Sequence, residues 1–187
     1  MGKSLTDRFW EMRHGLLRSY YYYESRLHFW VLFLFLTKSI EFLVGYPAVK
    51  NLFQGSDYGW NIILTIGAVA SFLISFFEAH KRIKILRAQK RVMGDCLAMM
   101  PSDDSCGDED LYAKIKSKRV KAERKDDEIL EVLDAMCYNK ASKTLGAQEK
   151  YRITKTQKFF GWWLPLPFTT EAQMEEQEDD EFKSEEI

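Results

Sequence analysis

The sequence predicts an all-α membrane protein, in which a two-helix transmembrane hairpin is joined to a cytoplasmic helical extension. Three observations support this fold class. Residues 27–46 and 58–77 are two apolar blocks, a connection with Pro47 and Gly55 separates them, and most of the charged residues follow them. The mean hydropathy of -0.33 over 187 residues therefore averages two very different parts of the chain. A chain of this length allows one compact domain or two small ones.

Residues 1–26 are predicted to form an amphipathic basic helix. One helical face carries Leu5, Phe9, Met12 and Leu16, and arginines occupy the other faces. Such a helix can lie among lipid headgroups; the alternative is a helix packed against the cytoplasmic domain. Because the segment is polar and lacks an apolar core before a small-residue cleavage site, we expect no cleavable signal.

Residues 27–46 and 58–77 are each expected to form a transmembrane helix. At a rise of about 1.5 Å per residue, each stretch covers a hydrocarbon core of about 30 Å. The alternative is a pair of buried helices in a soluble protein, but the polar remainder of the chain supplies too few apolar partners. Basic residues flank the pair on both sides, whereas the connecting loop has only Lys50. The positive-inside rule therefore predicts that both termini face the cytoplasm.

Lys38 and Glu41 are the candidate functional residues of the first span. They lie three residues apart on one helical face, where they can pair with one another or with a neighbouring helix. A charged side chain at the bilayer centre costs about 3 kcal/mol even on the lenient insertion scale, so both are expected to face protein or water. Two interpretations remain, a structural ion pair and the lining of a pore.

The second span has one face of polar and small residues. Its candidate pore-lining or intramembrane polar residues are Asn61, Thr65 and Ser71. Close helix packing is favoured by the four-residue repeat of Gly67, Ser71 and Ser75. Two helices cannot enclose an aqueous path, because polar groups at membrane depth must be covered by protein or water. The polar faces therefore predict a homo-oligomer in the lipid bilayer.

Residues 78–168 are predicted to form a cytoplasmic helical domain. One helix continues from the second span until Pro101, and a second is expected from Asp108 or Asp110 to about Asn139. The first half of this second helix is basic and is predicted to be solvated, whereas its second half is predicted to pack. Its candidate partners are solvent, lipid headgroups and the chain's own acidic tail. Sequence-specific nucleic-acid binding is not expected, because interleaved aromatic residues and a binding motif are lacking.

An aromatic segment and an acidic tail follow a shorter helix predicted after Gly146. The aromatic segment, residues 159–168, either anchors at the membrane interface or caps the cytoplasmic helices. The tail, residues 169–187, holds nine acidic residues and one lysine, a net charge of -8. Its low apolar content predicts disorder.

Motifs for catalysis and metal binding are absent from the sequence. The histidines His14, His28 and His80 have no metal-ligand spacing, and no nucleotide, hydrolase or metalloprotease motif is present. The three cysteines are an odd number without CxxC spacing, which favours free thiols in a reducing compartment. We expect neither an enzyme nor a cofactor.

The order of these segments, together with LDAMCYNKASKTLG at residues 133–146, resembles the SLATT family and related two-transmembrane effectors of bacterial conflict systems, including retron-associated ones. The resemblance covers residues 1–168 as an architecture, and its local sequence echo is Cys137, Tyr138 and Asn139. It implies a toxin of antiphage defence and abortive infection that acts at the bacterial inner membrane. It also implies a regulatory partner protein or nucleoprotein sensor that contacts the cytoplasmic helices. It assigns no site residue.

The sequence leaves two main functional classes open. In the first, oligomeric hairpins perforate or depolarise the membrane, and the cytoplasmic helices regulate them. In the second, the chain is a non-conducting anchor or scaffold that recruits a cytoplasmic partner through its C-terminal helices. A constitutive channel or transporter subunit that depends on Glu41 is a third possibility.

Overall fold

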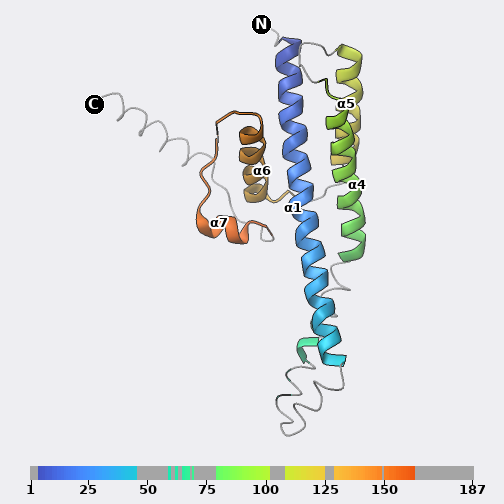
Figure 1. Ribbon diagram of the computed structural model, residues 1–187, viewed down its shortest axis with the longest axis vertical. Coiled ribbons are helices and arrows are strands. Elements are labelled where there is room, and N and C mark those ends of the chain that lie inside the picture. Colours follow the sequence, from blue (N-terminus) through green and yellow to red (C-terminus); the bar gives the residue numbers. More distant parts are fainter. Residues whose placement is uncertain are drawn as a thin grey trace, which may run out of the picture. The chain divides into compact units, whose positions relative to one another are not determined.

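The computed structural model describes residues 4–45, 59, 62, 65–67, 69, 79–101, 108–124, 129–148 and 150–162. All regular structure within these residues is helical, which confirms the all-α class. The helices in Figure 1 are α1 (Leu5–Gly45), α4 (Ala79–Ala98), α5 (Glu109–Glu123), α6 (Glu131–Thr144) and α7 (Lys155–Phe160). The chain divides into two compact units. Unit 1 comprises Met1–Ser25 and Ala88–Ile187, and unit 2 comprises Arg26–Arg87.

Short-range capping contacts determine where several of these helices begin. At the start of α1, the Asp7 N–H donates to Ser4 Oγ at 3.1 Å and the Ser4 N–H donates to Asp7 Oδ2 at 3.3 Å. The side chain of Asp108 caps α5, and Thr154 forms a capping box with Gln157 at α7. These side chains satisfy backbone N–H groups that have no partner inside the helix.

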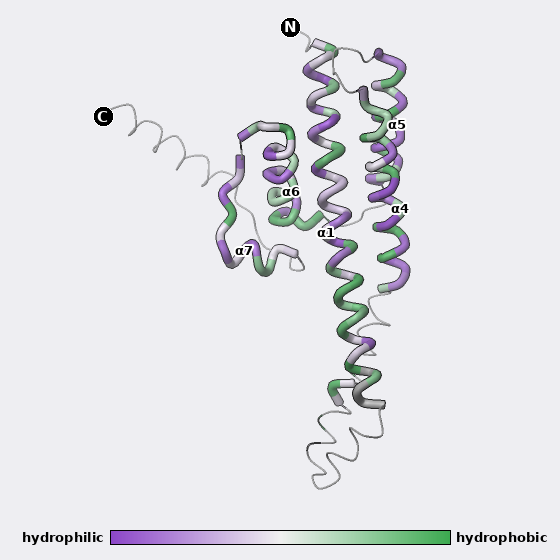
Figure 2. Tube along the Cα trace, viewed as in Figure 1, coloured by the Kyte–Doolittle hydropathy of each residue, from purple (hydrophilic) through white to green (hydrophobic). Residues whose placement is uncertain are grey.

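In unit 1, the N-terminal part of α1 packs against other helices. Phe9 and Leu16 are fully buried, and the ring of Phe9 meets Tyr112 of α5 edge-on with centroids 5.7 Å apart. On α6, Asp134 accepts two hydrogen bonds from the guanidinium of Arg18. Figure 2 shows hydrophilic and hydrophobic residues alternating along this part of α1. Its apolar face is thus covered by protein, which is the second of the two alternatives that the sequence left open.

The predicted single helix from Asp108 or Asp110 to Asn139 is wrong, because α5 and α6 take its place. Leu130, just before α6, has an extended backbone with φ -83° and ψ 101°. Its N–H donates to the hydroxyl of Tyr22 at 3.0 Å. In a continuous helix that N–H would bond to a carbonyl four residues earlier. A tertiary contact with α1 therefore replaces a helical hydrogen bond at this position.

The predicted contrast between a solvated basic part and a packed part is confirmed. Helix α5 buries only Ile115 and Ala122, whereas α6 buries seven of its residues. The remaining positions of α5 are largely lysines and other polar residues at the surface.

A left-handed residue two positions beyond the end of α6 turns the chain back. Gly146 has φ 72°, a conformation that costs glycine little and other residues more. The Ala147 N–H donates to Ser142 O at 2.9 Å, and the Gly146 N–H donates to Lys143 O at 3.2 Å. This is the hydrogen-bond pattern of a Schellman motif. The motif returns residues 150–153, here called the return segment, alongside α6.

Unit 2 holds the C-terminal part of α1, the described residues between 59 and 69, and the start of α4. In the part of the chain that the structure describes, no helix is both long and apolar enough to cross a membrane. The predicted transmembrane hairpin is therefore not supported by these residues. In the first predicted span, Lys38 and Glu41 interrupt the apolar run of α1. Of the second predicted span, only residues 59, 62, 65–67 and 69 are described, and these are helical.

Candidate functional site

Few of the residues predicted to be functional lie within the described part of unit 2. Lys38 lies on α1 with an exposed side chain, and of the second predicted span Thr65 is exposed and Gly67 is buried. Asn61, Ser71 and Ser75, and the side chain of Glu41, lie outside the described residues. The proposed pairing of Lys38 with Glu41 and the polar face of the second span therefore stay predictions.

A set of large apolar side chains is exposed in unit 2, and we call it the apolar surface. Each member exposes at least 45% of its surface, and Phe42 exposes 69%. The set comprises Val31, Leu32, Phe35, Leu36, Phe42, Ile62, Ile66 and Val69. Single exposed apolar residues are ordinary, but a concentration of them indicates a surface that is covered by lipid or protein.

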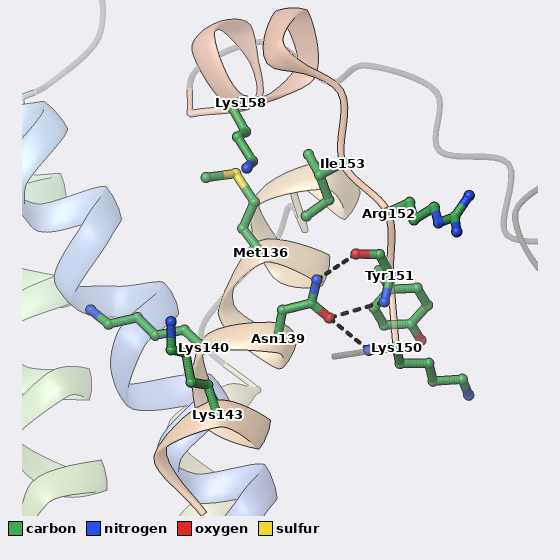
Figure 3. A pocket seen from close by; sticks show the side chains of 9 residues that line it. All are labelled: Met136, Asn139, Lys140, Lys143, Lys150, Tyr151, Arg152, Ile153 and Lys158. Carbon is green, nitrogen blue, oxygen red and sulfur yellow. Dashed lines mark hydrogen bonds between the residues drawn. The ribbon is translucent and has the colours of Figure 1, made fainter. Parts of the chain in front are cut away.

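A second candidate site is a pocket of about 650 Å³ in unit 1, which we call the basic pocket. Figure 3 shows that its walls come from α6, the return segment and α7. Five of its nine lining residues are cationic and none is acidic. The lining residues are Met136, Asn139, Lys140, Lys143, Lys150, Tyr151, Arg152, Ile153 and Lys158.

Asn139 holds the return segment against α6. Its Oδ1 accepts from the Lys150 N–H at 3.1 Å and from the Tyr151 N–H at 3.0 Å. Its Nδ2 donates to Tyr151 O at 2.5 Å. All three bonds are visible in Figure 3. A single side chain, 8% exposed, thus satisfies three backbone groups of the return segment.

The wall formed by α6 and α7 depends on helical spacing and on one glycine. Met136, Asn139 and Lys143 recur at intervals of three and four residues, so they share one face of α6. A Cβ atom at Gly161 would lie 2.5 Å from Val132 Cγ1. Because glycine lacks that atom, the chain just after α7 can approach α6 closely and keep Lys158 at the pocket.

The cations of the basic pocket differ in how far they are neutralised. Lys140 lies over the ring of Tyr21, 4.0 Å from its centroid, and its Nζ is 3.8 Å from a carboxylate oxygen of Glu24. Within the described part of the chain, neither Lys143 nor Lys158 forms an ion pair. Positive charge on α6 and α7 is therefore available to an anion.

A series of aromatic ring contacts connects the basic pocket to the core of unit 1. The ring of Tyr151 meets Tyr138 edge-on at 5.1 Å, and Tyr138 meets His14 at 4.4 Å. His14 is 7% exposed, and its Nε2 lies 2.9 Å from Ser142 Oγ. The ring of His14 also stacks with that of Trp10, with centroids 5.6 Å apart. The return segment is thus packed onto the same core as α1.

Two titratable groups in this core have shifted pKa values. Burial, followed by the nearby charges of Arg18 and Arg119, lowers the pKa of His14 below its ordinary 6.5. Burial, followed by the charge of Asp134, raises the pKa of the Cys137 thiol to about 12. His14 is therefore neutral at pH 7, and Cys137 is protonated.

The composition of residues 140–158 is the signal for the basic pocket in the sequence, although no motif marks it as a site. Between residues 140 and 158 there are six basic residues and a single acidic residue, Glu149. These cations are spread over α6, the non-helical return segment and α7, so no helical or strand periodicity groups them. Only the turn at Gly146 and the contacts of Asn139 bring them together.

No family model, curated protein or solved structure matches this chain. The likeness to two-transmembrane effectors therefore stays an expectation that rests on the order of the segments and on the stretch at residues 133–146.

Proposed function

We propose that this chain is an oligomeric effector of the bacterial inner membrane that perforates or depolarises it. In this proposal unit 2 is the part embedded in lipid, unit 1 is the regulatory part, and both termini are cytoplasmic. The observation that carries the proposal is the apolar surface of unit 2. Its eight large side chains are each at least 45% exposed.

The free energy that is lost by leaving this surface in water supports a state in which lipid or protein covers it. Fully burying a large apolar side chain contributes about 2 kcal/mol, so each half-exposed member forgoes about 1 kcal/mol. Summed over the set this is about 8 kcal/mol, which is comparable to the whole stability of a small domain. Lipid or a second copy of the chain would recover that energy.

The proposal requires an oligomer, because two helices cannot by themselves enclose an aqueous path across the membrane. Lys38 and Glu41 reduce the apolar character of α1. In an assembly they could face neighbouring helices or an aqueous path, while residues such as Phe35 and Phe42 face lipid. By its resemblance to two-transmembrane effectors, the chain would be the toxic arm of an antiphage system that a partner controls through unit 1.

Fractionation and membrane assays test this proposal. After induced expression in bacteria, the chain should sediment with membranes, and under activating conditions cells should take up an impermeant dye and lose membrane potential. The double variant Lys38→Leu, Glu41→Leu should still sediment with membranes but should change the dye uptake and the loss of membrane potential. Lys116→Leu with Glu131→Leu is a matched control, because both residues are exposed in unit 1. A chain that stays in the supernatant without detergent would rule the proposal out.

A non-conducting scaffold is the second candidate, and the basic pocket of unit 1 favours it. Unit 1 has its own packed core and a surface site that a partner could occupy. Replacing residues 27–77 with an unrelated two-span hairpin distinguishes the candidates. A scaffold keeps its function after this exchange, whereas a pore loses it.

A further inference from the structure

The basic pocket gathers positive charge from three consecutive elements of the chain. Lys143 comes from α6, Lys150 from the return segment and Lys158 from α7. None of the nine lining residues is acidic. The mutual repulsion of these like charges opposes folding. An anion bound among them makes the electrostatic free energy of the site favourable.

The geometry of the pocket is preorganised by groups that are not themselves cationic. Asn139 is buried, and three hydrogen bonds join it to the backbone of the return segment. Gly161 allows a close approach to Val132 of α6. The cations therefore project from a backbone that is fixed before any ligand arrives, which reduces the entropy lost on binding.

The size and lining of the pocket constrain the ligand. A volume of about 650 Å³ lies within the range of sites for small organic molecules and exceeds the needs of a single phosphate ion. Beside the cations, Met136, Tyr151 and Ile153 are only partly exposed and offer an apolar wall. The site therefore suits a molecule that combines several anionic groups with an organic moiety.

We propose that the basic pocket binds a small organic anion that carries two or more phosphate groups. Lys143 and Lys158 supply the main contacts, because neither is engaged in an ion pair within the described residues. Lys140 contributes less, because Glu24 and the Tyr21 ring already hold its ammonium group. The ligand can be a free nucleotide or the polyphosphorylated headgroup of a lipid. This inference goes beyond the membrane function and does not depend on it.

Binding measurements on the detergent-solubilised full chain test the proposal. The probes are ATP and inositol trisphosphate, titrated calorimetrically at fixed ionic strength. Lys143→Glu with Lys158→Glu should weaken binding of the preferred probe by about 100-fold, because two charge-assisted contacts are lost. Lys114→Glu with Lys116→Glu is the matched control, since both lysines are exposed on α5 outside the pocket. The control should change the affinity by less than about threefold.

Further arms identify the source of the ligand and guard against misfolding. Tighter binding of ATP indicates a free nucleotide, and tighter binding of inositol trisphosphate indicates a lipid headgroup. Lys143→Arg with Lys158→Arg should retain affinity, and circular dichroism should show equal helix content in every variant. Bound probe should also slow amide exchange in residues 150–153 of the unmodified chain. The proposal is overturned if neither probe binds with a Kd below 1 mM, which corresponds to about 4 kcal/mol of binding free energy. It is also overturned if the pocket variant and the control variant lose affinity equally.

Discussion

Asn139 is the side chain whose removal should most directly loosen the return segment. Its amide makes three hydrogen bonds to the backbone of Lys150 and Tyr151, and it is 8% exposed. In Asn139→Ala, two N–H groups and one carbonyl lose their partner. Helix α6 itself should persist, because alanine is a stronger helix former than asparagine.

The expected magnitude follows from these contacts. A hydrogen bond contributes about 1 kcal/mol net, so three of them set an upper value of about 3 kcal/mol. Lys150 is exposed, and its freed N–H can bond to water. We therefore expect a loss of about 2 kcal/mol in the local opening free energy, which corresponds to about 30-fold faster amide exchange.

Native-state hydrogen exchange with mass spectrometry measures this effect. Peptides that contain residues 150–153 should exchange faster in Asn139→Ala, whereas peptides from α1 should change little. Lys143→Ala is the matched control, because Lys143 lines the same pocket but its side chain makes no hydrogen bond to the return segment within the described structure. Unchanged exchange of the Lys150 and Tyr151 amides in Asn139→Ala would refute the role assigned to this residue.

Three further predictions concern the core of unit 1. Gly161→Ala places a Cβ 2.5 Å from Val132 Cγ1 and should lower the free energy of unfolding by about 2 kcal/mol. Gly94→Ala is the control: its Cβ would have its nearest neighbour at 3.7 Å, so it should raise the free energy of unfolding by up to about 1 kcal/mol. If denaturant unfolding finds Gly94→Ala less stable than Gly161→Ala, this description of the packing is contradicted. The pKa of His14 in the folded protein lies below its ordinary 6.5. As the pH falls below 6.5, the unfolded chain therefore binds a proton at His14 more readily than the folded chain does, and the free energy of unfolding decreases. Unfolding midpoints at pH 7.5 and pH 5 should differ less in His14→Gln, and an equal difference would count against a buried neutral imidazole. Cys137, with a pKa of about 12, should resist iodoacetamide until the protein is denatured, and rapid labelling of the native chain at this residue would show that the thiol is accessible.

Short-range chemistry made part of this fold predictable from the sequence. Pro101 follows α4 as expected, and the apolar spacing of Phe9, Met12 and Leu16 marks the buried face of α1. Capping side chains such as Thr154 act within three residues of their partners, so they operate in any context. The division into a solvated α5 and a packed α6 followed from the composition of the two segments.

Other features depended on contacts between residues distant in the sequence. The break before α6 involves the Leu130 N–H and the hydroxyl of Tyr22, 108 positions apart, and no local pattern encodes that bond. Packing in unit 1 likewise decided that the apolar face of α1 meets other helices, because periodicity shows which face is buried but not what covers it. The basic pocket exists because Asn139 and the turn at Gly146 fold a dispersed set of cations together. The sequence thus determined helix type and buried faces, whereas the tertiary structure decided which surfaces meet, since an apolar stripe is equally satisfied by lipid or by protein.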